Sequence, residues 1–238
     1  YILLDSKANA SYAAAFTLLN KGAEIFRTKK AVDEDEIQAC PGSFLIVNNS
    51  MVQEELPKIL QSSHLQAQSL DDITGIEKAA LKLPRVGLYQ SWKANMDEGW
   101  TRYVLDDLGI SYTTLHNKDF KSDKELQKRF DVIIFADENP DIIVEGKPKP
   151  DSRYARYYTE GPPEYEGGIG KEGVKALENF VAEGGRLITL NGASSFAINE
   201  FKPPVNNVLE NISRDEFFCP TSILRIEVNN QEPLGYGM

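Results

Sequence analysis

A short, uninterrupted apolar run, Val132-Ile133-Ile134-Phe135-Ala136, constrains the fold of this chain more than any other feature. The run shows no polar alternation, so both faces of the strand that it predicts must be covered. Strands of this kind are typical of parallel sheets, because the crossover connections of a parallel sheet place helices over it. The run therefore predicts a parallel sheet inside an α/β domain.

Strand and helix patterns alternate on both sides of this run. A capping box, Asn95-Met96-Asp97-Glu98, opens an expected helix that Gly109 ends, and Gly184-Gly185 ends another. The expected strands around them cover residues 85–89, 112–115 and 186–190, and the expected helices also include 124–130 and a stripe that begins near Gly173. This rhythm predicts an open, doubly wound, mostly parallel α/β sheet for residues 84–238.

Residues 1–83 are predicted to form a smaller N-terminal α/β module. Its expected strands cover 2–4, 24–28 and 43–47, and apolar residues at helical spacing predict helices over 8–19 and 52–60. Residues 71–83 have no clean period and Pro84 precedes a buried-looking strand, so we place the domain boundary between 83 and 84.

The charge balance argues against nucleic acid as a partner. The chain has 36 acidic and 26 basic side chains, for a net charge of -10, and such a field repels phosphate backbones and anionic lipid headgroups. No apolar run approaches the roughly 18 residues that span a bilayer. The chain opens at Tyr1 in an expected strand, without a basic or apolar leader, which favours a processed chain or an excised fragment.

Three strand ends mark the candidate site. In a doubly wound sheet, ligands collect beyond the carboxyl ends of the strands. The candidate residues at those ends, which we call the rim, are Ser91, Trp92, Asp137, Glu138, Asn139, Asn191 and Ser194.

The turn after Leu190 has a partial resemblance to a nucleophile elbow. Asn191-Gly192-Ala193-Ser194 places small residues after a strand, but the G-x-S-x-G string is absent. One hypothesis makes Ser194 a nucleophile with Glu138 or His116 as its base. The alternative is a plain turn from strand to helix.

Other motifs give weaker signals. Gly168 to Gly173 matches G-x-G-x-x-G, but no strand precedes it, so we expect a helix lead-in and no nucleotide cofactor. His64 and His116 lie in unrelated segments, so no metal site is expected, and a bridge between Cys40 and Cys219 stays open.

The segment from 141 to 170 is rich in Pro, Gly, Tyr and charge, and is longer than an ordinary connection. Its aromatic stretch from Arg153 to Tyr165, with Trp92, suits either a carbohydrate or peptide ligand or the covering of a neighbouring domain. Its tyrosines are Tyr154, Tyr157, Tyr158 and Tyr165.

Several strings resemble one protein family. They are Arg85-Val86-Gly87-Leu88-Tyr89-Gln90-Ser91-Trp92, Met96-Asp97-Glu98-Gly99-Trp100-Thr101-Arg102, Pro162-Pro163-Glu164-Tyr165-Glu166-Gly167-Gly168-Ile169-Gly170, Phe180-Val181-Ala182-Glu183-Gly184-Gly185 and Glu216-Phe217-Phe218-Cys219-Pro220. They are similar to the segment that follows the peptidase domain in large bacterial zinc carboxypeptidases of the carboxypeptidase A type. The similarity covers 84–238 well and 1–83 more loosely.

The resemblance implies a class I glutamine amidotransferase-like (flavodoxin-like) domain carried behind a peptidase domain of the same parent chain. It implies a periplasmic or secreted protein, with zinc only in the peptidase domain and none in this chain, and a domain that continues past Met238. The peptidase's H-x-x-E ligands have no counterpart here, and the turn after Leu190, where an amidotransferase Cys is expected, reads Asn191-Gly192-Ala193-Ser194. The resemblance therefore implies a non-catalytic accessory domain for packing, assembly or substrate presentation.

Overall fold

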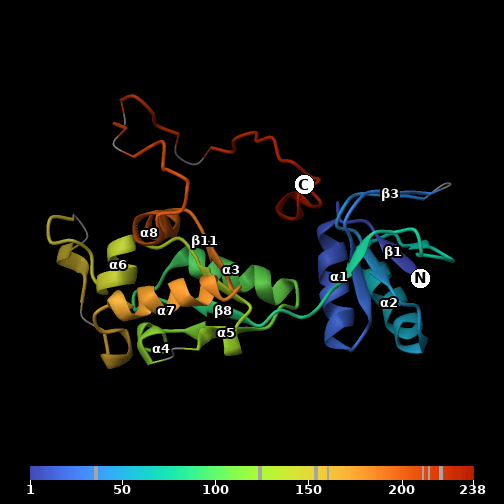
Figure 1. Cartoon of the computed structure of the whole chain (residues 1–238), viewed down its shortest axis with the longest axis horizontal. Helices are drawn as coiled ribbons and strands as arrows, with labels where there is room; N and C mark the ends of the chain where they lie inside the picture. The colour runs from blue at the N-terminus through green and yellow to red at the C-terminus, as the bar shows by residue number, and fades with distance from the viewer. Residues whose placement is uncertain are drawn as a thin grey trace. The chain divides into compact units, whose positions relative to one another are not determined.

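The computed structural model describes residues 1–34, 37–122, 125–152, 155–159, 161–210, 212–213, 215–219 and 222–238 (Figure 1). The chain forms two compact units, each with its own core. The first unit contains 1–83, 106–110 and 221–238, and the second contains 84–105 and 111–220. The two units therefore differ from the sequence-based domains 1–83 and 84–238, since residues 106–110 and the segment that begins at 221 group with the first unit.

The first unit is built on a five-stranded antiparallel sheet with the order β6-β1-β5-β2-β7. The strands are β1 (Ile2–Leu4), β2 (Ile25–Thr28), β5 (Phe44–Ile46), β6 (Gln68–Ser69) and β7 (Lys78–Ala80). The unit also contains α1 (Asn9–Asn20), α2 (Ser50–Ser63) and a separate hairpin of β3 (Val32–Glu34) and β4 (Ile37–Ala39).

Alternation along the central strands explains the two cores of this unit. Leu4 and Ile46 face a core shared with α1 and α2, while Leu3 and Leu45 face the opposite core with Leu70. The side chain of Asn49 caps α2 by accepting a 3.0 Å hydrogen bond from the Val52 amide. The sequence predicted both helices and three strands, and it missed the hairpin, β6 and β7.

Tyr236, near the end of the chain, packs into the first unit. Its ring lies beside the Arg27 guanidinium, which is also 5.4 Å from the ring centroids of Tyr12 and Phe44. Its backbone carbonyl accepts a 3.1 Å hydrogen bond from the Tyr12 hydroxyl. A Cβ added to Gly42 would lie 2.5 Å from the Tyr236 side chain, so a glycine is required under this ring. The contact ties the end of the chain to the first sheet.

The second unit is built on a four-stranded, all-parallel sheet with the order β11-β10-β8-β9. The strands are β8 (Val86–Tyr89), β9 (Tyr112–Leu115), β10 (Val132–Phe135) and β11 (Arg186–Thr189). The predicted parallel sheet and mixed α/β class are confirmed. Since β9 and β10 lie on opposite sides of β8, the strand order reverses there, and all carboxyl ends share one edge.

Five helices of this unit are α4 (Asn117–Ser122), α5 (Leu126–Arg129), α6 (Pro140–Glu145), α7 (Gly170–Ala182) and α8 (Gly192–Phe201). α7 contacts α4, α5, α6 and β11 (Figure 1). The core places Phe135 and Ile133 of the sheet against Phe180 of α7 and Phe196 of α8. The apolar run that predicted a buried strand is indeed β10.

Some local predictions change. The stretch 141–170, expected to be irregular, begins inside α6, because Asn139 caps a helix with Pro140 at its first position. The helix expected over 124–130 is shorter, at 126–129, and Lys124 lies outside the described residues. The sequence also missed α4.

The capping box at Asn95 opens α3 (Met96–Asp107) as predicted, since its side chain accepts hydrogen bonds from Asp97 N and Glu98 N. One face of α3 nevertheless leaves large apolar side chains in solvent: Met96, Trp100, Tyr103 and Val104, 77%, 61%, 60% and 51% exposed. We call these residues the α3 face.

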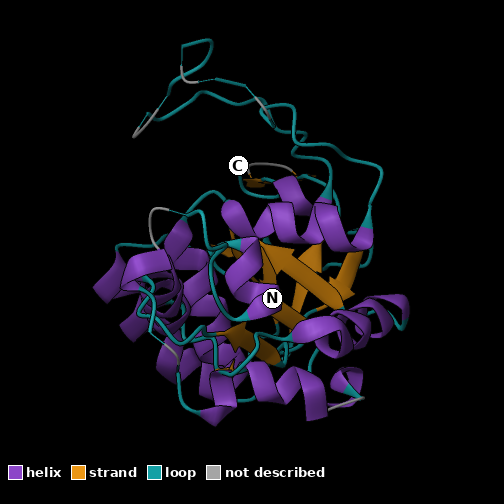
Figure 2. Ribbon diagram, turned by 90° about the vertical axis from the view of Figure 1, so that its left-hand side faces the viewer, coloured by secondary structure: helices purple, strands orange, loops and turns teal. Residues whose placement is uncertain are grey.

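After α8 the described residues from 202 to 232 contain no helix or strand, and Figure 2 draws this segment as loop. No helix in the described part of the chain is both long and apolar enough to cross a membrane.

Candidate functional site

The rim lies along the shared carboxyl edge of the second sheet. Ser91 and Trp92 follow β8, the acidic pair Asp137 and Glu138 follows β10, and Asn191 follows β11. Hydrogen bonds connect most of these side chains to one another or to Asn95, so the structure brings together residues that are a hundred positions apart.

Asn191 occupies the apex of the turn between β11 and α8. Its backbone has φ 46° and ψ −115°, close to the first central position of a type II′ turn, where glycine is usual. The turn closes with a 3.1 Å hydrogen bond from Ala193 N to the Leu190 carbonyl. Strained turns of this kind expose the nucleophile in hydrolases. Here the exposed side chain is a carboxamide.

Asp137 holds this turn from the neighbouring strand. One of its oxygens accepts a 2.6 Å hydrogen bond from Asn191 Nδ2, and the other accepts a 2.9 Å bond from Gly192 N. A Cβ added to Gly192 would lie 2.6 Å from Asp137 Oδ1. Only glycine therefore allows the carboxylate to approach the start of α8 so closely.

Ser194, the candidate nucleophile from the sequence, does not occupy the apex. It lies in the first turn of α8, where its hydroxyl donates a 3.1 Å hydrogen bond to the Thr189 carbonyl. Neither proposed base contacts it: Glu138 bonds Ser91 and Asn139, and His116 packs on Tyr165. The geometry required for the serine hypothesis is absent at this residue.

Glu138 forms the second part of the rim network. Its carboxylate accepts a short hydrogen bond from Ser91 Oγ, a 3.4 Å bond from Asn95 Nδ2 and a 2.8 Å bond from Asn139 N. Asn95 also donates to the Asp137 carbonyl.

Ser91 beside Glu138 has the composition of a nucleophile and base. Ser91 is only 6% exposed, however, and the cavity beside it measures about 10 Å³. This volume holds at most about one water molecule. The pair therefore has no room for a substrate in this conformation.

A buried layer lies beneath the rim. The Tyr89 hydroxyl donates a 2.8 Å hydrogen bond to Asn117 Oδ1, and Asn117 Nδ2 donates to the Tyr165 carbonyl at 2.6 Å. Burial raises the pKa of Tyr89 well above its ordinary value, and the negative charge of Glu138 raises it further. Tyr89 therefore stays protonated and acts as a hydrogen-bond donor.

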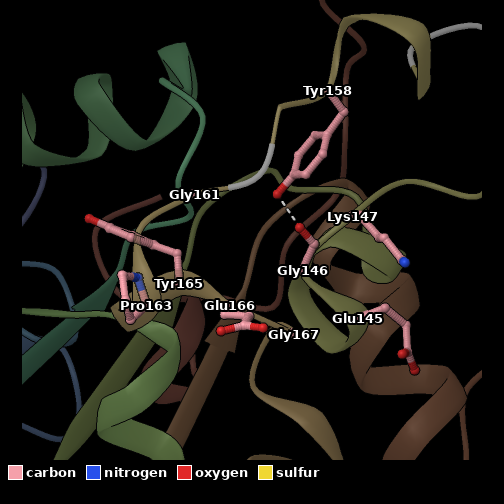
Figure 3. Close-up of a pocket in the computed structure, with 9 residues that line it drawn as sticks. All are labelled: Glu145, Gly146, Lys147, Tyr158, Gly161, Pro163, Tyr165, Glu166 and Gly167. Carbon is pink, nitrogen blue, oxygen red and sulfur yellow. Dashed lines mark hydrogen bonds between the residues drawn. The ribbon is translucent and has the colours of Figure 1, made fainter.

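Beside this layer, a pocket of about 350 Å³ opens among residues of the long segment (Figure 3). Figure 3 shows Tyr158 on one side, donating its hydroxyl to the Gly146 carbonyl, and Tyr165 on the other. Burial raises the pKa of Tyr158, with a smaller contribution from Glu138. The remaining lining residues are Glu145, Lys147, Gly161, Pro163, Glu166 and Gly167.

The aromatic residues of this segment pack on the protein itself. The Tyr165 ring centroid lies 5.2 Å from that of Trp92 and 4.8 Å from that of His116. A Cβ on Gly161 would lie 2.7 Å from Trp92, so this backbone packs closely against one part of the indole, which is still 41% exposed. Tyr157 is exposed, and Arg153 and Tyr154 lie outside the described residues.

The other sequence motifs have structural roles. Gly168 and Gly170, in the G-x-G-x-x-G string, have positive φ and lead into α7 after a 3-10 turn (Pro163–Tyr165), with no strand before them. The described residues include no group of three or more His, Cys, Asp or Glu side chains arranged for a metal ion. Cys40 and Cys219 are free thiols.

The sequence did not predict Asn95 as a partner of the rim, or Asn117 as the partner of Tyr89 and Tyr165 in the layer beneath it. Asn95 was assigned only to a helix cap, although its side chain also joins the ends of β8 and β10. Its position four residues after Ser91, in the loop that follows β8, is the signal that was available.

Comparisons of the chain with protein-family models, with curated proteins and with solved structures returned no match.

Proposed function

We propose that this chain is a non-catalytic accessory domain of a bacterial zinc carboxypeptidase, with a doubly wound, amidotransferase-like second unit. Its partner is the peptidase domain of the same parent chain, in a periplasmic or secreted protein. The chain contributes a packing surface for assembly or substrate presentation, and zinc belongs to the peptidase domain.

The observation that carries this proposal is Asn191 at the apex of the turn. A carboxamide cannot serve as the nucleophile that a strained strand-to-helix turn presents, and this carboxamide is bonded to Asp137. The hydroxyls of Ser91 and Ser194 are engaged in hydrogen bonds within the protein. The rim is consistent with a structural network in which the polar groups bond one another.

The sheet order supports the fold assignment. In the second unit, β9 lies on one side of β8 and β10 lies on the other. Doubly wound domains have a reversal of this kind at their switch point. The partner surface that we assign is the α3 face. Exposed apolar side chains grouped on one helix are typical of interaction sites, and aromatic residues dominate binding energy at interfaces.

The first experiment measures enzymatic activity of the purified chain. We expect no carboxypeptidase turnover with added Zn²⁺ and no release of ammonia from glutamine above a protein-free blank. Turnover of either substrate would contradict the non-catalytic assignment. Translating the gene upstream of Tyr1 tests the parentage, since an H-x-x-E motif there is expected.

The second experiment tests the α3 face. With the peptidase domain encoded upstream as the binding partner, Trp100→Ala is expected to weaken association by about 30-fold. The matched control is Val181→Ala on α7, because Val181 is also exposed, at 45%, but lies away from the α3 face. Equal affinities of the two variants for the peptidase domain would contradict the assignment of the α3 face as the partner surface.

A second candidate function rests on the pocket in Figure 3. Its volume of about 350 Å³ is at the lower end of the range for small-molecule sites, and it presents two tyrosines beside two carboxylates. This lining suits a carbohydrate or a short peptide. A titration of oligosaccharides and peptides, followed through amide hydrogen exchange at 155–167, tests it. Protection of these amides supports binding, and unchanged exchange contradicts it.

A further inference from the structure

The turn that has Asn191 at its apex also contains a dipeptide that is chemically reactive. Asn191-Gly192 is the single Asn-Gly sequence in the chain. An asparagine followed by glycine can cyclise when the next backbone nitrogen attacks the side-chain carbonyl carbon, because glycine has no side chain to obstruct the five-membered ring. We propose that Asn191 is a site of self-modification, in which Asp137 promotes succinimide formation with Gly192.

The backbone of Asn191 already has the torsion that the ring requires. Cyclisation needs Cβ and the following nitrogen on the same side of the Cα–C bond. With ψ at −115°, Asn191 Cβ comes within about 10° of eclipsing Gly192 N, because Cβ is offset by about 120° from the backbone nitrogen at a tetrahedral carbon. Residues other than glycine adopt positive φ only a few per cent of the time. The fold therefore holds Asn191 in a conformation that an unfolded chain seldom visits.

Asp137 contacts both reacting groups. Its Oδ1 accepts from the nitrogen that attacks, Gly192 N at 2.9 Å, and its Oδ2 accepts from the nitrogen that leaves, Asn191 Nδ2 at 2.6 Å. Asn191 is exposed, so ammonia can depart and water can enter. Among the residues that the structure describes, no side chain other than Asp137 forms a hydrogen bond with Gly192 N or Asn191 Nδ2.

The reaction balances with water alone. The Gly192 nitrogen loses its proton to Asp137 and forms a bond to Asn191 Cγ. The Cγ–Nδ2 bond then breaks, and the departing nitrogen takes up the proton from Asp137 and leaves as ammonia. Water opens the succinimide at either carbonyl, which gives aspartate or isoaspartate at position 191.

The product would change the rim. A carboxylate at position 191 cannot donate to Asp137, and two negative charges would then face each other across the turn. Isoaspartate would also lengthen the main chain by one carbon at the start of α8. Modification is therefore expected to loosen the link between β10 and β11.

The test compares rates at Asn191 in the folded protein and in the same protein unfolded in urea, by peptide mapping with isoaspartate detection. Pre-organisation predicts a rate at least about tenfold higher in the folded protein. Asp137→Asn, checked for folding by circular dichroism, is expected to lower the folded rate about tenfold. Equal or slower modification in the folded protein would overturn the proposal, as would an unchanged or faster rate in Asp137→Asn.

A pH profile keeps the proposal testable if Asp137→Asn fails to fold. Proton loss to hydroxide makes the rate rise tenfold per pH unit, whereas proton loss to Asp137 gives a shallower rise between about pH 6 and pH 8. The unfolded protein supplies the reference slope. Identical slopes for folded and unfolded protein would overturn the role of Asp137.

Discussion

Asp137 Oδ2 lies 2.6 Å from Asn191 Nδ2, and this hydrogen bond joins the end of β10 to the apex of the turn after β11. The partner oxygen of the same carboxylate accepts from Gly192 N. Together these two hydrogen bonds hold the Asn191 side chain, an amide, at the apex of the turn on the carboxyl edge of the second sheet.

The backbone strain at Asn191 predicts an unusual order of stability. Asn191→Ala removes the hydrogen bond and keeps a side chain at positive φ, whereas Asn191→Gly removes the hydrogen bond and relieves the strain. We expect the glycine variant to be more stable than the alanine variant by about 1 kcal/mol. Both tryptophans, Trp92 and Trp100, lie in the second unit, so fluorescence during urea unfolding reports on it. An alanine variant as stable as the glycine variant would contradict the strained turn.

Because Asp137 lies so close to Gly192, we expect glycine-to-alanine substitutions at Gly192 and at Gly99 to have opposite effects on stability. Gly192→Ala places a methyl group 2.6 Å from Asp137 Oδ1 and is expected to destabilise the second unit by about 1–3 kcal/mol. Gly99→Ala, inside α3 with no atom within 4 Å of the added carbon, is expected to stabilise it by up to about 1 kcal/mol. Urea unfolding of the two variants measures this, and the same sign for both would argue against the close contact.

The end of the chain is expected to stabilise the first unit through Tyr236. Tyr236→Ala removes the ring that packs beside Arg27 and over Gly42, with an expected cost of about 2 kcal/mol. Tyr236→Phe retains the ring and loses only the 3.0 Å hydrogen bond to the Lys29 carbonyl, so it should cost less than half as much. Amide exchange of β2 and β5 measures both. If both variants lost the same stability, the hydroxyl of Tyr236 and not its ring would be the stabilising group.

The ion pair between Arg85 and Asp131 predicts a pH dependence. Arg85 donates to both carboxylate oxygens and lowers the pKa of Asp131 from 3.8 to about 2. Because the folded pKa is the lower one, the stabilisation is present above about pH 4 and is lost as the pH falls toward 2. Both side chains are nearly half exposed, which limits the effect through solvent screening.

Asp131→Asn is therefore expected to lower the melting temperature by only about 2 °C at pH 6 and to match the wild type near pH 2. Glu178→Gln, which breaks the more exposed pair with Lys175, is the control and should show almost no change. A difference that persists at pH 2 would exclude the ion pair as its cause.

Periodicity and capping predicted the elements whose signals are local. The run Val132–Ala136, the Asn95 cap and the glycines at 22, 109 and 184 all mark elements that the structure contains, because each depends on neighbouring residues. The strands β3 and β4 pair with each other and are three residues long, which is too short for a clear alternating pattern. The two-residue strand β6 lacked a local signal because its pairing with the distant strand β1 decides it. The α3 face shows a further limit. The sequence predicted the helix correctly, but its pattern does not tell whether the apolar side chains of that helix are buried or exposed.

The rim residues were chosen from strand ends alone, and five of the seven join one hydrogen-bond network. Their roles depended on geometry that the sequence does not encode locally. The φ of Asn191 placed it at the apex in place of Ser194, and the burial of Ser91 closed the space beside Glu138.

The central claim is that the carboxyl edge of the second sheet presents no nucleophile, and chemical labelling tests it most directly. A fluorophosphonate probe for serine and an iodoacetamide probe for thiols are applied to the wild type and to Asn191→Cys, with the labelled residues identified by mass spectrometry. We expect no fluorophosphonate label at Ser91 or Ser194 in the wild type, and rapid thiol labelling at position 191 in the variant, which shows that the apex is accessible. Fluorophosphonate labelling of Ser91 or Ser194 in the folded wild type would contradict the account.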